Sequence, residues 1–285
     1  MNIIGIDLGG TQIRAASINE TRLSEVYSRR ISASGSAETV MNELMELVEG
    51  LIDKTVEAIG IGVPSVVDVE KGIVYDVQNI PAWKEVHLKK ALEDRFGIPV
   101  LVNNDANCFA LGEKYFGKGQ QRHSFIGLTL GTGIGAGVII RDRLYEGLHC
   151  GAGEFGMVDY LDQYYEYYAS GQFFHRCYDT SGEAIFIQAS AGESAALRIL
   201  EEFGMHLGNA IKMILYTYDP ELIILGGSIR QAYDYFQKPM WERIRTFAYP
   251  KSLERFSLEV STLKDAGVLG AAALYYDKHP EKGRG

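Results

Sequence analysis

The 285-residue sequence has few cysteines and no long uninterrupted apolar run. Its three cysteines, Cys108, Cys150 and Cys177, are too few for a disulfide scaffold and are typical of a reducing cytosol. No stretch reaches the roughly 18 apolar residues that a transmembrane helix needs. The short run Ile3–Ile6 is interrupted at once by Asp7. We therefore expect neither a signal peptide nor a membrane span, and we expect a cytoplasmic protein.

Positive charge is also scarce. Lysine and arginine together number 28 against 37 aspartates and glutamates, which gives a formal net charge of −9. Proteins that bind nucleic acid usually present a basic surface, so we expect neither nucleic acid nor an anionic membrane as a partner. A phosphate ligand is still possible, because backbone amides and Mg²⁺ can hold phosphate without a basic surface. The chain is long enough for two domains.

Apolar periodicity predicts strands and helices along most of the chain. Strands are predicted at 2–7, 12–18, 58–63, 99–103, 125–130, 138–140 and 222–225, and helices at 36–55, 86–96, 106–116, 192–218 and from 266 onward. Each half opens with a strand, a glycine turn and a second strand. This weak internal repeat is compatible with two α/β domains of related topology.

Three glycine turns directly follow predicted strands, at Gly9-Gly10, Gly131-Thr132-Gly133 and Gly226-Gly227. Any one of them could be an ordinary tight turn. As a set they favour a nucleotide site, because glycine lets the backbone approach a phosphate and expose its N–H groups. We expect the first two to hold a triphosphate and the third to pass beneath a nucleoside. The hydroxyls of Thr11 and Thr132 suit phosphate oxygens, and the alternative is that both are ordinary strand residues.

Two aspartates follow predicted strands. Asp7 lies in the first glycine turn, where a carboxylate repels phosphate unless a cation lies between them. We therefore predict a water-mediated Mg²⁺ contact for Asp7, with a turn-capping role as the alternative. Asp105 comes directly after the strand at 99–103, where a helix begins. We predict that Asp105 is the base that accepts a hydroxyl proton in phosphoryl transfer, with an ordinary helix N-cap as the alternative.

Five motifs in a fixed order resemble the ROK family, which comprises repressors, open reading frames and sugar kinases, including bacterial glucokinases. They are Asp7-Leu8-Gly9-Gly10-Thr11, Gly62-Val63-Pro64, Asn104-Asp105-Ala106-Asn107, Leu130-Gly131-Thr132-Gly133-Ile134-Gly135 and Gly153-Glu154-Phe155-Gly156. The resemblance extends from residue 2 to about residue 275. It implies an α/β protein with the actin-like ATPase (ribonuclease H-like) fold, in which two lobes flank a central cleft. We expect one lobe at 1–116 with 265–285 and a larger one at 117–264.

The resemblance also implies an activity and a set of site residues. The activity is phosphorylation of a hexose, at its C6 hydroxyl, by Mg·ATP, with glucose as the first expectation and a homodimer as the assembly. Asp105 is implied as the catalytic base. The implied sugar contacts are Asn79, Asn104, Asp105, Glu154 and Glu166. Asn79 is placed by the segment Asn79-Ile80-Pro81-Ala82-Trp83, and Glu166 by Glu166-Tyr167-Tyr168-Ala169-Ser170.

The sequence departs from the family where most members hold a structural zinc ion. Met157 stands in place of the family's histidine, and the segment 158–165 replaces its cysteine cluster. Methionine is a poor zinc ligand and tyrosine a rare one, so we predict no zinc site. The six tyrosines between 160 and 178 could replace the metal by aromatic packing, line a dimer surface or form a lid. A substitute zinc site is disfavoured because two of its four candidate ligands are adjacent: His149, Cys150, His175 and Cys177.

Two departures from the family pattern bear on the identity of the sugar substrate. Met157 replaces the histidine, and Ser65 stands where the family usually has glycine, so the sequence does not determine which sugar is bound. Fructose, other hexoses, N-acetylhexosamines and β-glucosides are the alternatives to glucose. A sugar-binding protein without catalysis is a further alternative. A sugar-responsive transcription regulator is disfavoured, because the glycine hairpin begins at residue 2 and we expect no DNA-binding domain before it.

Overall fold

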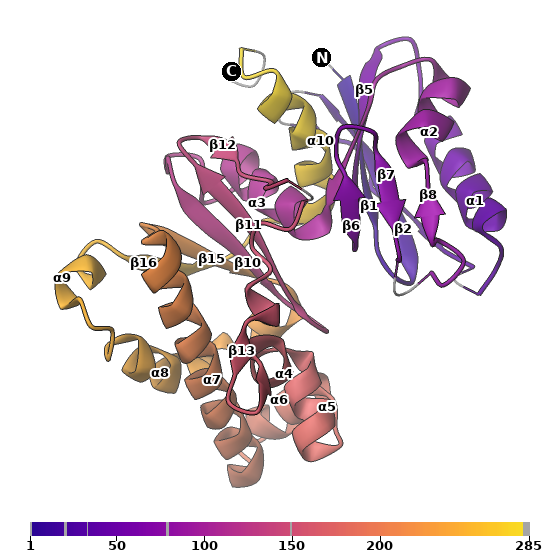
Figure 1. Cartoon of the computed structure of the whole chain (residues 1–285). Coiled ribbons are helices and arrows are strands. Elements are labelled where there is room, and N and C mark those ends of the chain that lie inside the picture. Colours follow the sequence, from indigo (N-terminus) through magenta and orange to yellow (C-terminus); the bar gives the residue numbers. More distant parts are fainter. Residues whose placement is uncertain (1, 20–21, 33, 78–79, 149, 282–285) are drawn as a thin grey trace. The chain divides into compact units, whose positions relative to one another are not determined.

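The computed structural model describes residues 2–19, 22–32, 34–77, 80–148 and 150–281 (Figure 1). The chain divides into two compact units. Unit 1 comprises 1–123, 137–152 and 262–285, and unit 2 comprises 124–136 and 153–261. The lobe boundaries expected from the sequence stay a prediction. Within the described ranges, no helix combines the length and the apolar character needed to cross a membrane.

Unit 1 is built on a sheet with the strand order β3-β2-β1-β5-β9, with β4 also paired to β2. The strands are β1 (Asn2–Leu8), β2 (Gln12–Asn19), β3 (Arg22–Leu23), β4 (Tyr27–Arg30), β5 (Val56–Val63) and β9 (Val100–Asn104). Strands β1 and β2 form an antiparallel hairpin, whereas β1, β5 and β9 run parallel. Parallel strands are covered on both faces, which explains why β5 reads as a continuous apolar run.

Helices cover both faces of this sheet: α1 (Ala37–Glu49) and α2 (Leu88–Phe96) lie on one face, and α3 (Asp105–Phe116) and α10 (Ala266–Lys278) on the other (Figure 1). Glycines let α10 lie directly on the strands. A Cβ on Gly5 of β1 would stand 2.1 Å from the Val268 carbonyl oxygen of α10. A Cβ on Gly60 of β5 would stand 1.8 Å from the Ala271 carbonyl oxygen. The helix therefore requires glycine at both positions.

Two smaller groups of strands complete unit 1. Strands β6 (Val66–Asp68), β7 (Ile73–Tyr75) and β8 (Glu85–Val86) form an antiparallel sheet. Strand β11 (Ile134–Ile140) begins in unit 2 and ends in unit 1, where it pairs with β12 (Arg143–Leu144).

Unit 2 contains a parallel ladder of β10 (Phe125–Leu130), β15 (Leu222–Gly226) and β16 (Ser257–Val260). Its longest helix, α7 (Ser194–Tyr218), packs against α8 (Tyr233–Ile244). The remaining elements are η1 (Phe155–Met157), β13 (Asp159–Tyr160), β14 (Gln163–Tyr164), α4 (Tyr165–Ala169), α5 (Gly171–Tyr178), α6 (Gly182–Ser190), η2 (Ser228–Ala232) and α9 (Pro250–Leu253). Buried phenylalanines from α5, α7 and α8 contact one another through stacked, tilted and edge-on rings in its core: Phe173, Phe174, Phe203 and Phe236.

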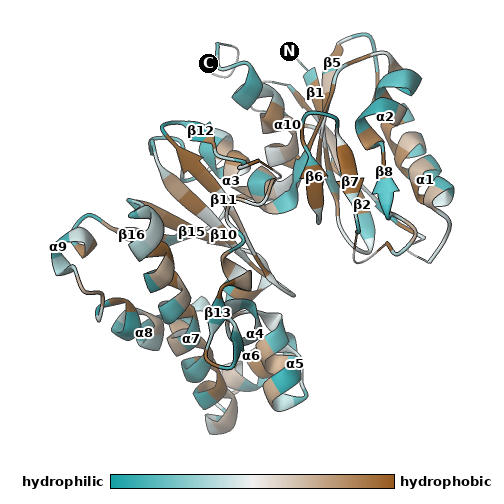
Figure 2. Cartoon of the chain, viewed as in Figure 1, coloured by the Kyte–Doolittle hydropathy of each residue, from teal (hydrophilic) through white to brown (hydrophobic). Residues whose placement is uncertain are grey.

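The long predicted elements are present, but one helix is shorter than expected. The helix predicted at 36–55 ends at Glu49, because Gly50 caps it and the chain turns there. The apolar pattern continues past the end of the helix because Leu51 and Ile52 also pack against the core of unit 1, and this made the predicted helix too long. Figure 2 colours each residue by hydropathy, with hydrophobic colours on the central strands of unit 1 and hydrophilic colours on much of α2.

Candidate active site

The glycine loop that follows β10 is a tight turn closed by its own backbone, because the Gly131 N–H donates to the Gly133 carbonyl oxygen at 3.0 Å. A Cβ on Gly131 would have no neighbour within 4 Å, so this position is open to a ligand. A Cβ on Gly133 would stand 2.4 Å from Oε2 of Glu166. The first glycine therefore leaves space beside the loop, and the second makes room for a carboxylate.

The glycine pair that follows β15 lies directly beside β10. Strands β10 and β15 pair in parallel, with Thr129 opposite Gly226, so their carboxyl ends meet at one edge of the sheet. Gly227 has φ +78°, and a Cβ there would stand 2.1 Å from the Leu130 carbonyl oxygen. Only glycine permits this backbone conformation and approach. Arg230 fixes the turn by donating to the Gly227 carbonyl oxygen at 2.6 Å.

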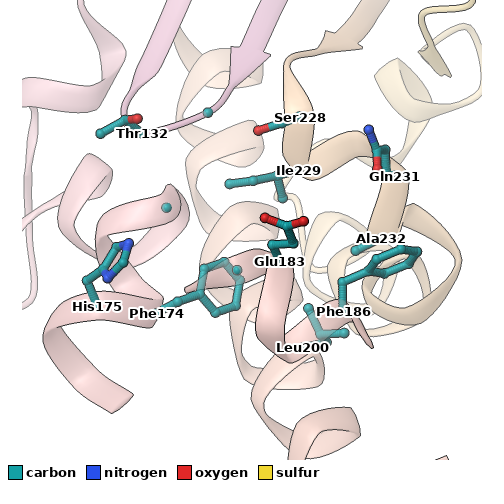
Figure 3. Close-up of a pocket in the computed structure, with 13 residues that line it drawn as sticks. Thr132, Phe174, His175, Glu183, Phe186, Leu200, Ser228, Ile229, Gln231 and Ala232 are labelled. Atoms are coloured by element: carbon teal, nitrogen blue, oxygen red, sulfur yellow. The ribbon is translucent and has the colours of Figure 1, made fainter. Parts of the chain in front are cut away.

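A pocket of about 420 Å³ opens between the two glycine turns, within unit 2 (Figure 3). Its lining comes from the loop after β10, from α5, α6 and α7, and from η2: Gly131, Thr132, Gly171, Phe174, His175, Gly182, Glu183, Phe186, Leu200, Ser228, Ile229, Gln231 and Ala232. A mixture of aromatic and aliphatic walls with a few polar groups is typical of small-molecule sites, and the volume is in their usual range. The pocket is therefore large enough for a nucleoside.

Two glutamates predicted to contact a sugar lie near one another in unit 2. The carboxylate of Glu166, on α4, accepts from the Ile134 N–H at 2.8 Å and from the side-chain amide of Gln172 at 2.5 Å. Glu154 precedes η1, and part of its surface reaches solvent. Loss of hydration raises the pKa of Glu154, and the nearby Glu166 carboxylate raises that pKa further. The pair is a source of hydrogen-bond acceptors.

Asp7 is the second-last residue of β1 in unit 1, close to the turn formed by Gly9, Gly10 and Thr11. Burial raises the pKa of Asp7, although the nearby Arg14 guanidinium lowers it in part. A Cβ on Gly267 would stand 2.7 Å from the Asp7 carboxylate, so the first turn of α10 makes room for the side chain. A partly buried carboxylate beside a glycine turn fits one protein contact of a hydrated Mg²⁺.

Asn104 and Asp105 stand at the junction of β9 and α3, also in unit 1. The Asn104 side chain accepts from the Ala106 N–H at 2.9 Å, and it donates to the Ser65 carbonyl oxygen at 3.2 Å. Asn104 is therefore the N-cap of α3, and Asp105 is the first residue of the helix. Asp105 also accepts from the Ala106 N–H, at 2.8 Å.

A buried polar network underlies this junction. Asn103 and Asn107, both 1% exposed, face each other at 2.9 Å, and Asn103 donates to Glu146 at 2.6 Å. The Cys150 thiol donates to the Asn103 side-chain oxygen at 2.9 Å. The sequence did not single out Asn103 or Glu146. The spacing of Asn103 and Asn107, four residues apart across a helix start, is the signal that could have revealed their contact.

Burial raises the pKa of Cys108 well above its usual range, and the carboxylates of Asp105 and Asp7 raise it further. Asp7 lies opposite Gly62 in the β1–β5 ladder, and a Cβ on Gly62 would stand 3.5 Å from the Cα of Asp105. Unit 1 brings these two predicted residues together, whereas the Gly131 and Gly226 loops, Glu154 and Glu166 belong to unit 2. Asn79 lies outside the described residues.

The ROK family model matches residues 3–278. The chain belongs to the ROK family. A glucokinase of Thermotoga maritima is 29% identical to this chain over 98% of both proteins. An N-acetyl-D-glucosamine kinase of Pasteurella multocida is 32% identical over 96% of this chain and 99% of that protein. A xylose repressor of Bacillus subtilis is 27% identical over 96% of this chain and 77% of that protein.

Solved structures show the same fold. A ROK hexokinase from Thermus thermophilus superposes with a TM-score of 0.84 at 27% identity, covering 99% of this chain and all of that one. A ROK glucokinase from Streptomyces griseus, solved with glucose and AMPPNP, gives a TM-score of 0.81 at 28% identity over 96% and 99% of the two chains. This ROK protein therefore has the actin-like ATPase fold expected from its motifs.

Aromatic residues occupy the segment that corresponds to the zinc site expected in most family members. Tyr160 stacks on Tyr165 with ring centroids 4.4 Å apart, and its hydroxyl accepts from Asn209 at 2.8 Å. Tyr168 and His206 also lie against Tyr160 and against each other. Within the described ranges no three His, Cys, Asp or Glu side chains gather into a group that could hold a metal ion. Met157 is 52% exposed.

Proposed function

We propose that this ROK protein is an ATP-dependent sugar kinase that phosphorylates a hexose hydroxyl, at C6, with glucose as the first candidate. The observation that carries the proposal is the pocket of about 420 Å³ beside the Gly131 and Gly226 turns, which suits a nucleoside. Kinases of glucose and of N-acetyl-D-glucosamine are among the relatives that align over almost the whole chain. The net charge of −9 supports a small-molecule substrate rather than nucleic acid.

In the proposed reaction, the nucleoside of ATP binds in the pocket and its phosphates lie along Gly131, Thr132 and Gly133, with Gly9, Gly10 and Thr11 as the second phosphate turn. The sugar is bound by Asn79, Asn104, Glu154 and Glu166. Asp105 accepts the proton of the attacking hydroxyl as that oxygen bonds to the terminal phosphorus and ADP leaves. The Asn104 cap fixes where α3 begins, so it also orients Asp105.

The proposal includes Mg²⁺, held through water by Asp7. When bound, the ion would neutralise charge on the phosphate oxygens. It also includes a homodimer and a cytoplasmic location. Cys108, Cys150 and Cys177, all within the described residues, form no disulfide, which suits a reducing compartment.

The first experiment measures ADP release from Mg·ATP with a panel of sugars that contains glucose, fructose, N-acetylglucosamine, a β-glucoside and xylose. Turnover of one hexose above the rest supports the proposal and names the substrate. No ADP release with any sugar, combined with direct binding of one of them, would contradict it. That outcome would favour the second candidate, a non-catalytic sugar-binding protein, which the resemblance to xylose repressors suggests.

Replacing Asp105 with Ala tests the catalytic base. Turnover should fall by about 10²- to 10⁴-fold, the usual contribution of a general base, while sugar binding measured by calorimetry weakens far less. Asp105→Asn, which keeps the side-chain shape and its bond from Ala106, should lose turnover to a similar degree. Near wild-type turnover in Asp105→Asn would show that Asp105 is only a helix-start residue.

A further inference from the structure

The glycine loop after β10 is fastened to a segment that lies 32 residues further along the chain. Three hydrogen bonds join them: from the Ile134 N–H to Glu166 Oε2 (2.8 Å), from Ser170 Oγ to the Thr132 carbonyl oxygen (3.0 Å), and from the Gly171 N–H to the Gly131 carbonyl oxygen (2.8 Å). Each bond holds a different residue of the loop. The shape of the loop therefore depends on the segment 166–171.

Glu166 makes the one charged contact among these three. Its Oε2 lies where a Cβ on Gly133 would stand only 2.4 Å away, so carboxylate and glycine are matched in size. Its Oε1 accepts from the Gln172 side-chain amide at 2.5 Å. Hydrogen bonds to an ionised acceptor are stronger than neutral ones, so this contact should contribute most to the loop.

The fastened loop is also a wall of the pocket. Gly131 and Thr132 line the pocket from one side of the bonds, and Gly171 lines it from the other. A change in the Glu166 contact would therefore alter the wall beside the nucleotide, even though Glu166 itself is not among the lining residues.

We infer that Glu166 is a positioning residue for the nucleotide, because its carboxylate holds the 131–134 loop in the shape that receives the phosphates. This role is separate from the sugar contact that the family motif implies for Glu166. The inference rests on the proposed function for the identity of the ligand, a nucleoside di- or triphosphate.

The experiment titrates Mg·ADP into the full chain by calorimetry with no sugar present, so that sugar contacts cannot contribute. Glu166→Ala should weaken Mg·ADP binding by roughly 10-fold or more, as expected for a lost charged hydrogen bond. Glu154→Ala is the matched control, because Glu154 shares the predicted sugar role, whereas the three bonds described above come from the segment 166–171. It should stay within about twofold of wild type.

Glu166→Gln should largely restore Mg·ADP affinity. The amide oxygen can still accept from Ile134. Once the Gln172 amide turns over, the new NH₂ group can donate to Gln172 Oε1, a buried acceptor that has no partner among the described residues. If Glu166→Ala fails to fold, Ser170→Ala takes its place and should weaken Mg·ADP binding about threefold, in line with a neutral hydrogen bond.

The inference is overturned if Glu166→Ala binds Mg·ADP as wild type does, or if Glu154→Ala loses as much affinity. Both results leave the proposed kinase activity intact, because wild type still binds nucleotide and releases ADP. Wild-type protein that does not bind Mg·ADP would instead overturn the proposed function and this inference together.

Discussion

His206 shows how a single side chain on α7 responds to its surroundings. Its side chain is 14% exposed, and Nδ1 lies 3.2 Å from the Tyr160 hydroxyl. Burial lowers the pKa of His206 and the nearby Arg243 lowers it further, whereas Glu202, 3.7 Å away, raises it in part. The imidazole is therefore neutral in the folded protein at pH values where an exposed histidine already begins to charge.

This environment predicts a loss of stability in mild acid. Because the unfolded chain binds the proton more readily, the contribution of neutral His206 is present above about pH 6.5 and is lost as the pH falls through the lowered folded pKa. His206→Gln removes the titration. The difference in Tm between wild type and His206→Gln should therefore narrow between pH 7.5 and pH 5, measured by differential scanning fluorimetry.

His87→Gln is the matched control, because the His87 side chain is 59% exposed. This variant reports how the Tm difference changes with pH when an exposed histidine is replaced. A His206→Gln difference that changes no more than the His87→Gln difference would contradict the prediction.

At the scale of elements, close helix packing in unit 1 depends on missing side chains. Helices α3 and α10 approach so closely that a Cβ on Gly270 would stand 1.6 Å from the Cys108 carbonyl oxygen. A Cβ on Gly112 would stand 2.6 Å from the Ala266 carbonyl oxygen. The contact supports Asp105, because Asp105 begins α3.

Gly270→Ala should therefore destabilise unit 1 by about 3 kcal/mol, the upper end for overpacking, because backbone atoms on both sides must move. We expect a fall in Tm of about 5 °C or more. Gly50→Ala is the control: Gly50 has the ordinary helical φ of −73°, and its nearest neighbour would be 3.5 Å away, so stability should hold or rise slightly. Equal Tm values for the two variants would show that the helices can separate at little cost.

The elements also show how far sequence reasoning reaches. Strands β1, β5 and β9 were predictable because their apolar runs are long and end at glycine, at proline or at polar residues. The segment 159–190 was not, because its short helices take their packing from α7, which is distant in sequence: α4 and α6 lie against α7, and α5 contacts Phe203 on it. The glycine turns could be read locally. The bond from Ile134 to Glu166 could not, since it depends on how 131–134 and 166–171 meet.

At the scale of the whole molecule, aromatic packing occupies the region where most ROK family members are expected to hold zinc. The cluster of Tyr160, Tyr165, Tyr168 and His206 joins the hairpin β13–β14, helix α4 and helix α7. Helix α4 carries Glu166, so this cluster also fixes the carboxylate that fastens the glycine loop. Stacked and edge-on rings each add about 0.5–1.5 kcal/mol beyond the area they bury.

This arrangement predicts that the protein folds and works without zinc. Elemental analysis of the purified full chain should find well below one zinc per chain, and a zinc chelator such as dipicolinic acid should leave Tm unchanged. Sugar phosphorylation should survive the chelator when Mg²⁺ is supplied in excess, because no step proposed for Asp105 uses a second metal. One zinc per chain, with a Tm that falls on chelation, would contradict this. It would mean that side chains such as His149, which lies outside the described residues, complete a metal site after all.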